Sequence, residues 1–100
     1  MPRAPAPKPQ PLDAAAKREQ ARLLVAFGEQ LRKLRHDRLL TIEQVAEAAG
    51  IHPNYLGSVE RGERNLTLFN IWRIANGLGL PAVGLMTELP ARKVKRSTAP

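Results

Sequence analysis

Hydrophobic residues recur every three or four positions through most of the chain, which is the spacing of amphipathic helices. A first stripe passes through Leu24, Phe27, Leu31 and Leu34 and predicts a helix that ends near Arg38. Similar stripes follow in four shorter segments, and no run alternates with the period of two that is typical of a β-strand. The pattern therefore predicts an all-α fold, a compact domain of five helices.

Two of the predicted helices are short and are separated by one tight turn. Thr41 is a good N-cap, and Gln44 completes a capping box three residues later. Gly50 suits the left-handed position that ends a helix, and Pro53 suits the first position of the next helix. The turn of about three residues is that of a helix-turn-helix, a motif that places its second helix in DNA.

The remaining helices follow a polar loop. Thr67 can cap a fourth helix that stops at Gly79, and Pro81 opens a short fifth helix that closes before Pro90. The apolar positions of these two helices are Leu68, Ile71, Ile74, Ala75, Leu78, Val83, Leu85, Met86 and Leu89.

The chain divides into a proline-rich disordered arm at residues 1–18, a helical domain at 19–89 and a basic disordered tail at 90–100. Five prolines precede residue 12, whereas Asp13 is a possible cap for a run of good helix formers that would lengthen the first helix. The basic side chains of the ends are Arg3, Lys8, Lys17, Arg18, Arg92, Lys93, Lys95 and Arg96. Either Arg3 and Lys8 enter a minor groove or Lys93, Lys95 and Arg96 contact phosphates, or the ends are simply solvated.

The formal charge of +7 is concentrated in these ends. The middle of the chain, from 21 to 89, holds eight basic and seven acidic residues. Total charge is therefore weak evidence for nucleic-acid binding, and the argument depends on where Arg61 and Arg64 lie.

Composition removes several classes of function. The chain has no cysteine, so it has no thiolate metal site, and we expect neither a metal nor another cofactor. It has no apolar run of about 20 residues that would cross a membrane, which predicts a soluble cytoplasmic protein of bacterial or phage origin, associated with the nucleoid. The only serines, Ser58 and Ser97, and the only histidines, His36 and His52, form no catalytic arrangement, so we expect no enzyme.

Arg35 and Glu60 are two charged residues on otherwise apolar helix faces, four positions after Leu31 and Leu56 respectively. A lone charge in such a place would be costly, whereas a bidentate Arg–carboxylate pair would satisfy both groups. We predict that this pair joins the first helix to the third and orients the third.

The predicted third helix, about residues 53–61, has an apolar inner side and a polar outer side. Its outer side should enter the major groove of an operator. The candidate base-reading residues, at or near this side, are His52, Asn54, Ser58 and Arg64. The candidate phosphate contacts, at the approach and exit of the helix, are Thr41, Tyr55, Arg61 and Asn65. Gly57, inside this helix, either permits close approach to the groove or is simply tolerated.

Trp72, the only tryptophan, lies at the edge of the fourth stripe. It is either a core residue or part of a self-complementary surface for a two-fold homodimer. The candidate interface residues are Trp72, Leu80, Val83, Met86 and Leu89. A dimer would present two reading helices about 34 Å apart to a pseudo-palindromic site.

These residues resemble the lambda-repressor-like, or xenobiotic-response-element, helix-turn-helix family over roughly Phe27 to Leu80. The resemblance lies in residues 31–35, 41–46, Gly50 and 60–62, and the stretch 55–68 is similar to controller proteins of restriction-modification systems. It implies regulation of a promoter, often as a dimer, and a structural pair at Arg35 and Glu60.

Two positions depart from the family pattern. Ile42 replaces a frequent glutamine, and Pro53 replaces a polar or basic residue. Both replacements remove expected DNA contacts. The alternative is a protein-binding module of the antitoxin type, which would neutralise a partner toxin and repress its own operon.

Overall fold

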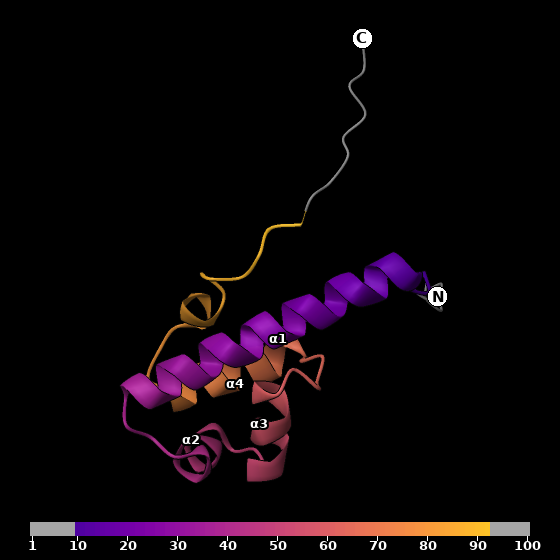
Figure 1. The fold of residues 1–100 in the computed structure, drawn as a ribbon. Coiled ribbons are helices and arrows are strands. Elements are labelled where there is room, and N and C mark those ends of the chain that lie inside the picture. Colours follow the sequence, from indigo (N-terminus) through magenta and orange to yellow (C-terminus); the bar gives the residue numbers. More distant parts are fainter. Residues whose placement is uncertain (1–9, 93–100) are drawn as a thin grey trace, which may run out of the picture.

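The structure of the chain, a computed structural model, describes residues 10–92. In this part the chain forms α1 (Ala14–Asp37), α2 (Ile42–Ala49), α3 (Pro53–Glu60), α4 (Leu68–Gly77) and one turn of 3-10 helix, η1 (Ala82–Leu85). Helix α1 crosses the molecule, with α2 and α3 on one side of it and η1 on the other (Figure 1). The all-α fold is confirmed.

The prediction of five α-helices is wrong for the described residues, which hold four. The segment after Pro81 makes only the four-residue η1, and Pro81 provides no side-chain hydrogen bond to cap it. Tight 3-10 turns rarely propagate further, and Gly84 lowers helix propensity inside this one.

The helix ends predicted at Asp13, Thr41 and Gly50 agree with the structure. Asp13 accepts a hydrogen bond from the backbone of Ala16 at 2.8 Å, and both hydrogen bonds of the box between Thr41 and Gln44 are present. Gly50 adopts the left-handed conformation, with φ of 71°. Because α1 begins directly after Asp13, the predicted domain boundary at residue 19 lies inside this helix. The predicted DNA contacts at Arg3, Lys8, Lys93, Lys95 and Arg96 lie outside the described residues.

Every helical element contributes to a single core, whose largest fully buried side chains are Leu31, Val45, Leu56, Val59, Ile74 and Leu85. Helix α2 packs mainly on α4, and α3 packs on α1 and α2. Trp72 is 53% exposed, so its interpretation as a core residue is wrong: Ile74 and Ala75 fill the buried side of α4 instead. The helices of the described residues are too short or too polar for any of them to cross a bilayer.

Helices α1 and α3 approach each other most closely at Gly28. A Cβ atom at this position would lie 2.4 Å from the carbonyl oxygen of Glu60 and 2.6 Å from that of Val59. Both contacts are far below a normal van der Waals distance, and both involve backbone. Glycine at position 28 is therefore required for α3 to lie against α1, and the sequence pattern did not single it out.

Candidate nucleic-acid interface

Helix α3 is tied to α1 by the predicted ion pair. Arg35 Nε lies 2.7 Å from Glu60 Oε2, and Arg35 Nη2 lies 2.9 Å from Glu60 Oε1, so the pair is bidentate. Only 9% and 6% of the two side chains are exposed. Arg35 Nη1 also donates to the carbonyl oxygen of Leu40, and the hydrogen bonds to Glu60 raise the pKa of Arg35. One guanidinium thus joins α1, α3 and the start of α2.

A second arginine fixes the turn between α2 and α3. Arg73, on α4, donates from Nε to the carbonyl oxygen of Ala49 at 2.9 Å and from Nη2 to that of Gly50. These acceptors are backbone groups at the end of α2, which have no partner inside the helix. Arg73 therefore holds the motif turn rigid, a role that the sequence pattern did not reveal.

The first turn of α3 presents Asn54 to solvent. Asn54 is exposed, and its backbone N–H donates to Nδ1 of His52 at 3.0 Å. His52 is thus the N-cap of α3. The side chain of Asn54 makes no hydrogen bond within the described residues, so its amide is free to meet a ligand.

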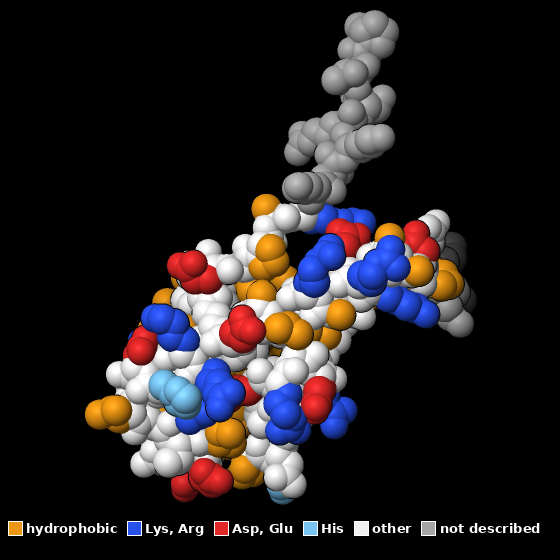
Figure 2. Space-filling model, viewed as in Figure 1, with side chains coloured by type: hydrophobic (Ala, Val, Ile, Leu, Met, Phe, Trp, Pro, Cys, Tyr) orange, Lys and Arg blue, Asp and Glu red, His pale blue; other side chains and the backbone are white. Residues whose placement is uncertain are grey.

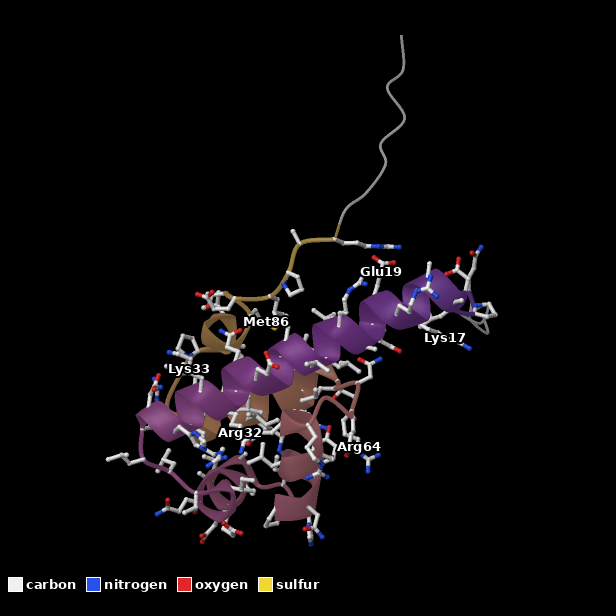
Figure 3. All side chains as sticks on the ribbon, viewed as in Figure 1. Lys17, Glu19, Arg32, Lys33, Arg64 and Met86 are labelled. Atoms are coloured by element: carbon white, nitrogen blue, oxygen red, sulfur yellow. The ribbon has the colours of Figure 1, made fainter. Side chains whose placement is uncertain are left out.

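The predicted outward orientation of Ser58 is wrong. Ser58 is 5% exposed, and its hydroxyl donates to the carbonyl oxygen of Tyr55 at 2.6 Å. The hydroxyl oxygen of Ser58 in turn accepts from Nε of Arg64 at 3.1 Å. The side chain of Arg64 folds back from the following loop and covers Ser58, whereas Arg64 itself is exposed on the outer side of α3 (Figure 3). Ser58 therefore positions Arg64 and does not face a groove.

The side chain of Arg61 lies over α3 at Gly57. Its Nη1 atom lies 3.2 Å from the place where a Cβ of Gly57 would be, so the missing side chain leaves room for the guanidinium. Its other edge is paired with Glu63, with Nε to Oε1 and Nη2 to Oε2 both at 3.1 Å. Basic and acidic side chains lie next to each other over α3 and its loop (Figure 2).

The pairing with Arg61 lowers the pKa of Glu63 below its usual value, first through the hydrogen bonds and further through the charges of Arg61 and Arg64. A lowered pKa means that the pair stabilises the folded state above the ordinary pKa of the carboxyl, and that this contribution is lost as pH falls through the folded value. Glu63 therefore remains ionised throughout the neutral range.

The other candidate phosphate contacts lie at different places. The ring of Tyr55 packs partly against the core, and its hydroxyl accepts from Nδ2 of Asn70 at 3.1 Å, which leaves the O–H free to donate. Thr41 is exposed at the start of α2. Asn65 is also exposed, but it lines a groove of about 600 Å³ beside the first half of α1, together with Leu24. The structure thus places Asn65 against α1 instead of α3.

The apolar surface lies on α4 and the segment after it. Phe69 and Trp72 are stacked with ring centroids 6.0 Å apart, and the adjacent Leu68 is 78% exposed. Val83 and Met86 are exposed as predicted. Leu80 and Leu89, which were also predicted to lie in the interface, instead pack partly against the core. They are therefore removed from the candidate interface. The prediction that Leu68 belongs to the apolar face of the fourth helix is thus wrong, and Phe69 was not singled out because it lies outside that stripe.

Comparison with known proteins places these features in a family. The family described as helix-turn-helix matches residues 31–85. The control protein C.SmaI of Serratia marcescens is 42% identical over 62 residues, which are 62% of this chain and 74% of that protein.

Two solved structures are also similar. The restriction-modification controller protein C.AhdI from Aeromonas hydrophila has a TM-score of 0.61 and 42% identity, and the match covers 62% of this chain and 94% of that chain. The controller C.Esp1396I, solved as a tetramer in complex with its natural 35 base-pair operator, has a TM-score of 0.61 and 28% identity over 65% of this chain and 86% of that chain.

Proposed function

Because the chain belongs to the helix-turn-helix family and is a DNA-binding transcriptional regulator, we propose that α3 is its reading helix and enters the major groove of an operator. One observation carries this proposal: the outer side of α3 bears an uncovered Asn54, with two exposed arginines, Arg61 and Arg64, along it. The buried pair of Arg35 and Glu60 holds that side away from the core. The named relatives support a regulator of this kind and not the antitoxin-type module.

Asn54 is the main base-reading residue in this proposal. An asparagine side chain can bind adenine in a bidentate arrangement: its amide N–H donates to N7, which is an acceptor, and its amide oxygen accepts from N6, which is a donor. His52 Nε2 and the free guanidinium nitrogens of Arg64 lie at the two ends of the helix and reach flanking bases or phosphates. Ser58 contributes through the position of Arg64.

Thr41, Tyr55 and Arg61 fix the register of α3 through phosphates. Each of them has a hydrogen-bond donor for a phosphate. The donors are the hydroxyls of Thr41 and Tyr55 and the guanidinium of Arg61, which is exposed but must first leave its partner Glu63. Such contacts carry affinity and orientation and do not carry sequence information. Asn65 is a weaker member of this set because of its place against α1.

Arg61→Ala should weaken binding to all DNA sequences and lower the slope of log K against log salt concentration by about 0.9, the value of one phosphate contact. The slope is measured by fluorescence anisotropy with a labelled duplex over a range of salt concentrations. Lys33→Ala is the matched control, because Lys33 is an exposed α1 residue on the side away from α3 (Figure 3). An unchanged slope in Arg61→Ala would remove Arg61 from the interface.

A second copy of the chain covers the apolar surface in this proposal. Leu68, Phe69 and Trp72 expose large apolar side chains on one helix, and Val83 and Met86 add to the exposed apolar area. Apolar patches of this kind mark protein contacts, and a two-fold dimer uses the same patch twice. The controller C.Esp1396I is a tetramer on its operator.

A footprint on the DNA beside the gene for this chain tests the proposed function. We expect protection of two half-sites related by symmetry, with centres about one helical turn, or about 34 Å, apart. Protection of a single asymmetric half-site would refute the dimer, and the absence of any salt-sensitive, sequence-specific protection would refute the function.

A further inference from the structure

We propose that Glu63 is an internal competitor of DNA, whose carboxylate occupies the edge of Arg61 that a backbone phosphate needs. The inference rests on the proposed phosphate contact of Arg61 and adds a control on its strength. In the free protein the contact is closed by the chain itself, and it opens only when a duplex replaces Glu63.

The geometry of the pair supports this competition. Glu63 takes both Nε and Nη2 of Arg61 at 3.1 Å, while Nη1 faces Gly57. The edge formed by Nε and Nη2 is thus occupied, and the remaining nitrogen points toward the helix. A phosphate that binds Arg61 through the Nε and Nη2 edge must first displace the carboxylate.

The backbone keeps Glu63 in place for this role. Its N–H donates to the carbonyl oxygen of Ser58 at 3.0 Å, and Gly62 before it has a φ of 76°, which turns the chain back toward α3. The backbone therefore positions the carboxylate of Glu63 next to Arg61. The two side chains remain 61% and 55% exposed, so incoming DNA can reach the pair.

Carboxylate and phosphate are equivalent ligands for such an edge, because both accept two parallel N–H bonds from a guanidinium. Glu63 also carries a negative charge of its own beside Arg61 and Arg64, the two arginines of the reading side, and that charge repels phosphates. Its effect applies to every DNA sequence. The expected consequence is weaker binding to non-cognate DNA, so that stable binding depends on the base contacts of Asn54.

Glu63→Gln tests the inference with two probes: a duplex enriched from a random-sequence library by the wild-type protein, and a scrambled duplex of the same length. We expect the variant to bind both about two- to five-fold more tightly than the control Glu88→Gln, as expected for loss of one exposed ion pair. Glu88→Gln removes the same charge from an exposed residue of the segment after η1, and η1 lies across α1 from α3 (Figure 1).

The increase in DNA affinity caused by Glu63→Gln must depend on Arg61. The double variant Arg61→Ala/Glu63→Gln should therefore bind DNA with the same affinity as the control double variant Arg61→Ala/Glu88→Gln. A gain equal to that of Glu88→Gln, a gain that persists without Arg61, or a loss of affinity would each overturn the inference.

The same set separates this inference from the proposed function. If Arg61→Ala weakens binding and lowers the salt slope while Glu63→Gln gains nothing beyond the control, the competition is refuted and the phosphate contact stands. If Arg61→Ala changes neither quantity, both are refuted. Melting temperatures of all variants should stay near that of the wild type, because both side chains are exposed.

Discussion

Glu60→Ala should lower the free energy of unfolding by about 3–5 kcal/mol, because it leaves the guanidinium of Arg35 buried without its partner. For a domain of this size each kcal/mol shifts the melting temperature by about 4–8 °C, so the change is large in a thermal melt. DNA affinity should fall with stability, since α3 loses its tie to α1. Thermal and urea denaturation measure the first effect, and anisotropy titration measures the second.

The double variant Arg35→Met/Glu60→Leu is the control for this prediction. Replacing both members of a buried pair with apolar side chains of similar volume is often neutral for stability. If the pair acts by orienting α3, this variant should recover most of the stability and the DNA binding. A Glu60→Ala protein that lost DNA binding at the wild-type melting temperature would contradict the structural role.

Gly28→Ala should destabilise the fold by about 1–3 kcal/mol, the usual effect of overpacking a tight contact. Alanine normally favours a helix interior by up to about 1 kcal/mol, so the expected sign is opposite to that of helix propensity. The reason is that the added methyl group would meet the carbonyl oxygens of Val59 and Glu60, which are backbone atoms of α3. Urea denaturation gives the free energy, and the same protein should bind DNA more weakly because α3 is displaced.

Gly84→Ala is the matched control for Gly28→Ala. Its added methyl group would meet only side-chain atoms of Leu80, at 3.5 Å, which is an ordinary contact. It should leave the free energy of unfolding nearly unchanged. If Gly28→Ala were as stable as the wild type, the close crossing of α1 and α3 described above would be wrong.

Local signals in the sequence predict much of this fold. Thr41 with Gln44, Gly50 and Pro53 mark helix ends through hydrogen bonds and backbone conformations that involve only near neighbours in the chain. The pair of Arg35 and Glu60 could also be predicted, because a charged residue on an apolar helix face requires an opposite charge.

The remaining parts of the site depend on contacts that helical periodicity does not contain. Helical periodicity predicts an exposed Ser58, yet its side chain is buried and Arg64 from the next loop covers it. The pairing of Arg61 with Glu63 depends on how the chain turns at Gly62, and the close approach at Gly28 depends on how two helices cross. Such features require the positions of segments relative to one another, which periodicity leaves open.

The most direct test of the central claim, that α3 reads DNA through Asn54, replaces each adenine of the footprinted site in turn with 7-deazaadenine, which lacks the N7 acceptor. Because the Asn54 amide donates to N7 in the proposed bidentate contact, the wild type should lose affinity by about 1–3 kcal/mol at one symmetry-related adenine in each half-site. Asn54→Ala should bind more weakly and be indifferent to the same replacements. Wild-type protein that tolerates every replacement, or Asn54→Ala protein with unaltered sensitivity, would contradict the account.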